Sequence, residues 1–175
     1  AKKNIDLKFS PIPKWDLVKS DFYNYFSVQT TRGCPFDCDF CSVTYLFGGS
    51  YRYKPIENII KEIYFIKNID QNKLIFFVDD NIVSNRAYAK ELFKALVPLN
   101  IRWYSQAPIA IAKDDELLEL MHRSGCRELF IGFESLSQES LEAMGKGRIN
   151  KVEEYEEAIE KIYSHNISIF ASFMF

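Results

Sequence analysis

Lys73-Leu74-Ile75-Phe76-Phe77-Val78 is the stretch of this sequence that decides the fold, and Asp79-Asp80-Asn81 follows it directly. A short and nearly continuous apolar run is typical of a parallel strand that is buried on both faces. A helical stripe of isoleucines precedes this run, and a second helical pattern follows it. Strand and helix therefore alternate here, which favours an α/β fold built on a parallel sheet.

The same alternation continues on both sides of this run. We expect further strands over residues 25–31, 101–105, 128–133 and 166–175, and helices near 56–66, 88–99, 114–125, 137–144 and 152–162. The chain has 175 residues, whereas a closed eight-stranded barrel needs roughly 250. The prediction is therefore a partial parallel (β/α) barrel of about five strands, truncated after strand five. Residues 1–22 read as an irregular lead-in and 23–175 as the core, and the apolar last strand suggests part of a larger protein.

The bulk composition is that of a soluble globular domain, with 47% hydrophobic and 26% charged residues. The net charge is −2 and no cluster of Lys or Arg stands out, so nucleic acid is not expected as a partner. No apolar stretch approaches the roughly 18 residues of a membrane span, and the first residues show no signal peptide. The cysteine usage suggests the reducing cytoplasm and metal ligation more than disulfides.

Three cysteines carry the clearest chemical signal, because Cys34, Cys38 and Cys41 lie in the spacing C-x3-C-x2-C after the first expected strand. Three thiolates on one loop can hold three irons of a [4Fe–4S] cube, and the fourth iron then stays open for chemistry. The alternative is a non-catalytic module that binds an iron–sulfur cluster or zinc. Zinc needs four ligands, and Cys126 is expected to be a small buried hydrophobic residue rather than the fourth.

Polar side chains follow several strands at the edge where parallel sheets bind ligands. These side chains are Asp79, Asp80 and Asn81 after the second strand, Ser105 and Gln106 after the third, and Glu134 and Ser135 after the fourth. Together with the cysteine loop they predict a site for a cluster and for a polar cofactor that carries a positive charge. Simpler interpretations are that Asp79 and Asp80 are turn residues, and that Glu134 pairs with Arg32 or Arg127.

The cysteine spacing, with the aromatic Phe40 just before Cys41, resembles that of the radical S-adenosylmethionine (SAM) superfamily. The strings 32–42, 76–81 and 132–135 are similar to the branch whose members often carry a cobalamin-binding domain, and the resemblance runs from about Trp15 to Phe175. It implies a partial (β/α)6 barrel that holds a [4Fe–4S] cluster and SAM. In this superfamily one electron cleaves SAM to methionine and a 5′-deoxyadenosyl radical, which abstracts hydrogen from an unreactive carbon.

The resemblance also implies a role for individual residues. Cys34, Cys38 and Cys41 would be the cluster ligands, and Phe40 would lie near the adenine of SAM. Asp79, Asp80 and Asn81 stand where many members have Gly-Gly-Glu, which holds the SAM amino group; this chain departs from that tripeptide, so either aspartate is a candidate. Glu134 and Ser135 match a strand end that binds the ribose hydroxyls or the methionyl group, and Gln106 is a further candidate for the same pocket.

Other expectations concern what this chain does not contain. The glycine-containing motif after the fifth strand and the sixth strand are absent, and so is a cobalamin-binding signature. Cobalamin would therefore belong to a separate domain. The resemblance implies a small-molecule substrate, a flavodoxin- or ferredoxin-like electron donor, and methylation or rearrangement of an unactivated carbon.

Overall fold

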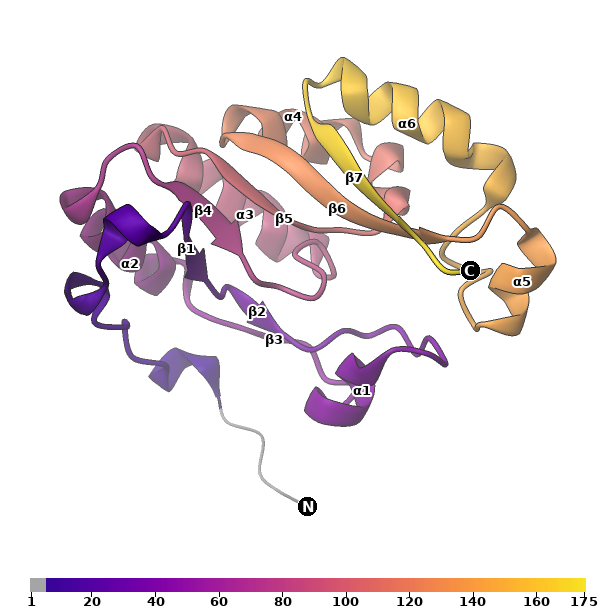
Figure 1. The fold of residues 1–175 in the computed structure, drawn as a ribbon, viewed down its shortest axis with the longest axis horizontal. Coiled ribbons are helices and arrows are strands. Elements are labelled where there is room, and N and C mark those ends of the chain that lie inside the picture. Colours follow the sequence, from indigo (N-terminus) through magenta and orange to yellow (C-terminus); the bar gives the residue numbers. More distant parts are fainter. Residues whose placement is uncertain (1–5) are drawn as a thin grey trace.

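A five-stranded parallel sheet forms the frame of the protein (Figure 1). The computed structural model describes residues 6–175 and gives the strand order β1-β4-β5-β6-β7. The strands of this sheet are β1 Tyr25–Val28, β4 Leu74–Phe77, β5 Trp103–Gln106, β6 Cys126–Glu134 and β7 Ser168–Phe173. A separate antiparallel ribbon pairs β2 Thr31–Arg32 with β3 Arg52–Tyr53. The predicted fold class is confirmed.

Helices connect the strands and cover one face of the sheet (Figure 1). The helices are α1 Ser42–Phe47, α2 Ile56–Ile69, α3 Arg86–Leu96, α4 Asp115–Arg123, α5 Gln138–Ala143 and α6 Tyr155–Ser164. Shorter 3₁₀ turns are η1 Leu7–Phe9, η2 Trp15–Leu17, η3 Ser20–Phe22, η4 Val97–Leu99, η5 Ile109–Lys113 and η6 Val152–Glu154. Helices α2, α3, α4 and α6 pack on the same side, and no helix formed by residues 6–175 covers the opposite face of the sheet. No helix within residues 6–175 is long and apolar enough to cross a membrane.

The hydrophobic core lies between the sheet and these helices. In β4, Ile75 and Phe77 are fully buried, while Leu74 and Phe76 point the other way and are only partly buried. The expectation that this strand is buried on both faces is therefore wrong. Because side chains alternate along a strand, the second face is the inner, helix-free face of an incomplete barrel.

Local sequence signals account for where several helices begin and end. Asn85 and Asp114 cap α3 and α4, since their side-chain oxygens accept hydrogen bonds from backbone N–H groups of the first turn. Gly125 ends α4 with a φ of +97°, and a Cβ there would lie 1.8 Å from the Ile101 carbonyl oxygen. Only glycine fits this position, which confirms the predicted helix end at Gly125.

The first and last strands are shorter than the sequence predicts. β1 ends at Val28 instead of Thr31, because the backbone N–H groups of Thr30 and Thr31 donate to the Asp79 side chain, and Thr31 then begins the separate strand β2. β7 begins at Ser168, because Asn166 has a left-handed backbone with a φ of +57°.

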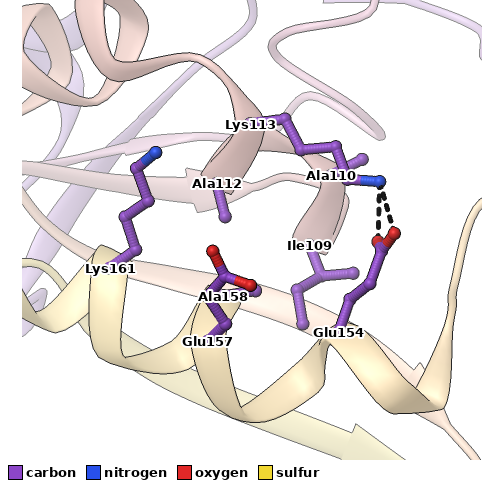
Figure 2. A pocket seen from close by; sticks show the side chains of 8 residues that line it. All are labelled: Ile109, Ala110, Ala112, Lys113, Glu154, Glu157, Ala158 and Lys161. Carbon is purple, nitrogen blue, oxygen red and sulfur yellow. Dashed lines mark hydrogen bonds and ion pairs between the residues drawn. The ribbon is translucent and has the colours of Figure 1, made fainter.

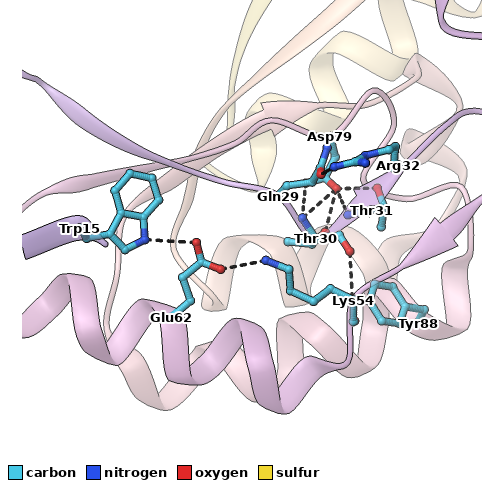
Figure 3. A network of polar contacts seen from close by, with 9 residues as sticks. All are labelled: Trp15, Gln29, Thr30, Thr31, Arg32, Lys54, Glu62, Asp79 and Tyr88. Carbon is cyan, nitrogen blue, oxygen red and sulfur yellow. Dashed lines mark hydrogen bonds and ion pairs between the residues drawn. The ribbon is translucent and has the colours of Figure 1, made fainter. Parts of the chain in front are cut away.

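The lead-in packs against the core through Trp15, while its residues 1–5 lie outside the described part of the chain. The Trp15 ring meets Phe26 edge-on at 5.3 Å, and its indole N–H donates to Glu62 Oε1 at 3.2 Å. Glu62 also pairs with Lys54 at 2.9 Å, and both charged side chains are almost fully buried (Figure 3). A buried ion pair of this kind is stable only with all its partners in place.

Candidate functional site

The three cysteines lie on the loop that joins β2 to α1, at the carboxyl end of the sheet. All three are partly buried and none forms a disulfide. Gly33 starts the loop with a φ of +91°, and a Cβ there would approach the Ser50 carbonyl oxygen to 2.5 Å. The loop turns back on itself, because the Cys41 N–H donates to the Cys38 carbonyl oxygen at 3.0 Å.

The thiols influence one another electrostatically. Burial raises the pKa of the Cys34 thiol, and hydrogen bonds from the Phe36 backbone and the Asn81 side chain oppose that rise. Burial also raises the pKa of the Cys38 thiol; the positive charge of Lys146 opposes this rise, and the other two thiols add to it. Bound metal ions favour the thiolate instead, since they deprotonate the thiols that ligate them.

The donor set suits a cube whose irons each take one thiolate. A single zinc ion would need a fourth ligand, and Cys126 cannot supply it. Cys126 is fully buried at the start of β6. Glu134, at the carboxyl end of the same strand, lies eight residues further along, a distance of about 26 Å. Within residues 6–175, no three His, Cys, Asp or Glu side chains are grouped as a site for one metal ion.

Asp79 anchors the start of the cysteine loop (Figure 3). Its carboxylate is fully buried and accepts hydrogen bonds from the Thr30 N–H at 3.1 Å, the Thr30 hydroxyl at 3.0 Å, the Thr31 hydroxyl at 2.5 Å, and the Thr31 N–H. Burial raises the pKa of this carboxyl to about 6, against these hydrogen bonds. The oxygens of Asp79 are thus occupied by the protein itself.

Asp80 and Asn81 lie closer to the cysteine loop. The Asp80 carboxylate is partly buried and accepts a hydrogen bond from the Gly33 N–H at 3.3 Å. Burial raises the pKa of Asp80, and the Gly33 hydrogen bond opposes the rise. The Asn81 side chain accepts from the Val83 N–H at 3.2 Å and reaches the Cys34 thiol. Of the two aspartates, Asp80 is the one with a carboxylate oxygen left for a ligand.

Glu134 ends β6 in a strained backbone conformation, with a φ of +65°. Its Oε1 lies 2.6 Å from Lys146 Nζ, which also donates to the Gly132 carbonyl oxygen at 2.9 Å. The predicted pairing of Glu134 with Arg32 or Arg127 is therefore wrong. Both Glu134 and Lys146 are about nine-tenths buried, and a non-glycine residue with positive φ commonly marks a functional site.

Lys146 connects this strand end to the cysteine loop. Its Nζ lies 5.8 Å from the centre of the Phe40 ring, and the Asp39 N–H donates to the Met144 carbonyl oxygen at 3.2 Å. Gly132 makes room for the ion pair, because a Cβ there would lie 2.2 Å from Glu134 Oε1 and 2.8 Å from Lys146 Nζ. The sequence reasoning missed Lys146, and no motif in its surroundings pointed to it.

The remaining predicted residues lie at the same edge with different surroundings. Gln106 is partly buried at the end of β5, and its carbonyl oxygen accepts from the Ile82 N–H at 3.1 Å. The Ser135 hydroxyl oxygen accepts from the Ser137 N–H at 3.1 Å, in the turn before α5. Ser105 is buried and donates to the Phe77 carbonyl oxygen, so its role is structural.

A hollow lies between η5 and α6 (Figure 2). Two lysines and two glutamates line its rim together with small apolar side chains, and Lys113 pairs with Glu154 at 2.7 Å. None of the residues predicted for the site lines this hollow.

A protein-family comparison decides the classification. The family model described as the radical SAM superfamily matches residues 28–175. This chain belongs to the radical SAM superfamily. The predicted resemblance to this superfamily is therefore confirmed.

Relatives of this radical SAM chain include named methyltransferases. It is 34% identical over 150 residues to the bacteriochlorophyllide d C-12(1)-methyltransferase of Chlorobaculum tepidum, covering 85% of this chain and 33% of that protein. It is 31% identical over 175 residues to the hopanoid C-2 methylase of Rhodopseudomonas palustris, covering 97% of this chain and 33% of that protein. The radical SAM chain thus spans about a third of these relatives.

A solved structure shares the fold of this radical SAM chain. The cobalamin-dependent S-adenosylmethionine radical enzyme OxsB, with aqua-cobalamin bound, superposes with a TM-score of 0.84 at 21% identity. The match covers 98% of this chain and 27% of OxsB. At this identity the similarity establishes the fold alone.

Proposed function

We propose that this chain is the core of an enzyme that cleaves SAM reductively, with a [4Fe–4S] cluster held by Cys34, Cys38 and Cys41. The observation that carries the proposal is the position of the three partly buried, free thiols. They lie on one loop at the carboxyl end of the sheet, beside Asp80 and the Glu134–Lys146 pair. Membership of the radical SAM superfamily supports the same chemistry.

The bound cluster would supply one electron to the SAM sulfonium, giving methionine and a 5′-deoxyadenosyl radical. The Asp80 carboxylate would bind the positively charged SAM amino group, with Asn81 beside it, while Asp79 keeps the loop in place. Glu134 would accept hydrogen bonds from the ribose hydroxyls through the oxygen that Lys146 leaves free. Phe40 would lie along the adenine, and Ser135 and Gln106 would complete the pocket.

The reaction that follows radical formation is proposed from the relatives. Because one of them is a methyltransferase and another a methylase by name, we propose methylation of an unactivated carbon in a small-molecule substrate, with rearrangement as the second candidate. Cobalamin would bind another domain of the full-length protein, as the cobalamin-dependent fold neighbour suggests. We further propose a flavodoxin- or ferredoxin-like electron donor and a cytoplasmic location.

Anaerobic reconstitution with iron and sulfide tests the cluster assignment. We expect about four irons per chain, loss of the cluster in Cys38→Ala, and retention in the matched control Cys126→Ala, whose thiol is buried away from the loop. The full-length protein, given SAM and a strong reductant, should release 5′-deoxyadenosine. A full cluster in Cys38→Ala would refute the ligand assignment, and a loaded enzyme that leaves SAM intact would favour a non-catalytic iron–sulfur module.

A further inference from the structure

The inner face of the sheet carries a wall of aromatic side chains. Phe76 and Tyr104 lie side by side on β4 and β5, with stacked rings 4.6 Å apart and 12° from parallel. The Tyr25 ring meets both of them edge-on, at 5.7 and 5.6 Å. Phe130 and Phe170 continue the wall on β6 and β7, with ring centres 5.5 Å apart.

Four side chains of this wall, Phe76, Tyr104, Phe130 and Phe170, line a hollow of about 330 Å³ on the inner face of the sheet. Phe170 is 58% exposed, and Phe76, Tyr104 and Phe130 are partly buried. Concave pockets lined mostly by aromatic side chains, with a few polar groups among them, are typical of small-molecule sites. Because Phe76 and Tyr104 turn their ring faces to each other, they offer ring edges to a ligand, and ring edges attract the face of a flat aromatic ring in T-shaped geometry.

Two polar side chains stand within the wall. Gln106 and Glu128 line the same hollow, and neither side chain makes a hydrogen bond or ion pair within residues 6–175. Burial, followed by the charges of Tyr25 and Glu128, raises the pKa of Tyr104 to about 12, so this phenol stays neutral at physiological pH. The Glu128 carboxylate therefore carries the only formal charge among the residues that line the hollow, and it favours a hydrogen-bond donor over an anion.

The wall is continuous with the candidate SAM site. Glu128, Phe130 and Gly132 alternate along the inner side of β6, and Gly132 lies directly beside the Glu134–Lys146 pair. The four residue steps from Glu128 to Gly132 correspond to about 13 Å along the strand. A molecule resting against Tyr104 would need roughly this length to reach the chemistry at the strand ends.

We propose that this hollow binds the substrate, and that the substrate is a flat, mostly apolar ring system about 13 Å long. It would carry a hydrogen-bond donor, such as an amine, hydroxyl or ring N–H, at the end facing Glu128. Its reacting carbon would be at the opposite end. That the bound molecule is a substrate rests on the proposed function, whereas its binding in the hollow does not depend on SAM cleavage.

Two fluorescent probes of equal shape test the proposal: 1-aminopyrene, which offers a donor, and pyrene-1-carboxylate, which carries a negative charge. We expect this chain and the full-length protein to bind 1-aminopyrene at least tenfold more tightly than the carboxylate. Tyr104→Ala should weaken 1-aminopyrene binding at least tenfold. Glu128→Gln should bring the two affinities within about threefold of each other. Tyr64→Ala is the control, because Tyr64 is similarly exposed (54%) but lies on α2.

Each contrary result overturns the proposal. Equal losses in Tyr104→Ala and Tyr64→Ala would mean non-specific adsorption, and probe binding by this chain but not by the full-length protein would mean that polypeptide covers the face. Circular dichroism checks folding, and Phe170→Ala, at an exposed position, replaces Tyr104→Ala if that variant fails to fold.

The release of 5′-deoxyadenosine is measured on the same full-length samples without probe. Probe binding without that product refutes the proposed function alone, and the product without probe binding refutes this inference alone.

Discussion

Replacing Lys146 by methionine tests the ion pair that joins the end of β6 to the cysteine loop. Methionine keeps the length of the side chain but removes its charge, so the Glu134 carboxylate loses a partner 2.6 Å away. Removing one partner of a buried pair costs about 3–5 kcal/mol. Because Glu134 and Lys146 keep 10% and 13% of their side-chain exposure, we expect the lower end, a loss of about 3 kcal/mol in the free energy of unfolding.

Urea unfolding followed by circular dichroism measures this loss, and in a domain of this size it corresponds to a fall in Tm of roughly 6–12 °C. Glu134→Gln in the Lys146→Met background removes the unpaired charge. The double-mutant cycle should therefore show a coupling energy of at least about 2 kcal/mol. Lys94→Met is the control, since Lys94 and its partner Glu116 are about 60% exposed, and it should cost less than about 1 kcal/mol. Additive losses, or a loss below about 1 kcal/mol in Lys146→Met, would refute the reasoning.

Three further predictions concern the loop and its anchors. Burial raises the pKa of Asp79 to about 6 from its ordinary 3.8, so the folded state binds this proton more tightly than the unfolded state does. As the pH rises from 4 to 7, the free energy of unfolding of wild type in urea titrations should therefore fall by roughly 2 kcal/mol more than that of Asp79→Asn. The same pH dependence in both proteins would contradict this. Gly33→Ala should lower the free energy of unfolding by about 1–3 kcal/mol and reduce the iron bound after reconstitution, because its Cβ would meet the Ser50 carbonyl oxygen. The control Gly49→Ala has open space around its Cβ and should bind as much iron as wild type. Asp80→Asn should weaken SAM binding about tenfold by calorimetry of the reconstituted protein, as expected for the loss of one charged partner; unchanged affinity would remove Asp80 from the SAM site.

The sequence predicted the architecture because its strongest signals are periodic. The apolar run of β4 and the helical stripes each report on local structure, and the order of elements then implies a parallel sheet. The burial of only one face of β4 could not be predicted in this way. That burial depends on whether the barrel closes, which is a property of the whole sheet.

The candidate site was predictable in its residue types but not in its pairings. Asp79 and Asp80 are neighbours in sequence, and only the backbone conformation decides that one carboxylate turns into Thr30 and Thr31 while the other faces Gly33. The ion-pair partner of Glu134 could not be predicted from the sequence either. The loop after α5 must fold back before Lys146 meets that carboxylate, and no periodic pattern encodes this return.

The contact of Trp15 with Glu62 gives the protein a built-in optical reporter. The chain has two tryptophans, and Trp103 is fully buried in the core, where its indole N–H donates to the Ser124 carbonyl oxygen at 3.1 Å. Trp15 instead lies on the lead-in, with its indole N–H against a carboxylate. Phenylalanine at one position at a time would separate the two emission spectra, so that detachment of the lead-in could be observed independently of melting of the sheet.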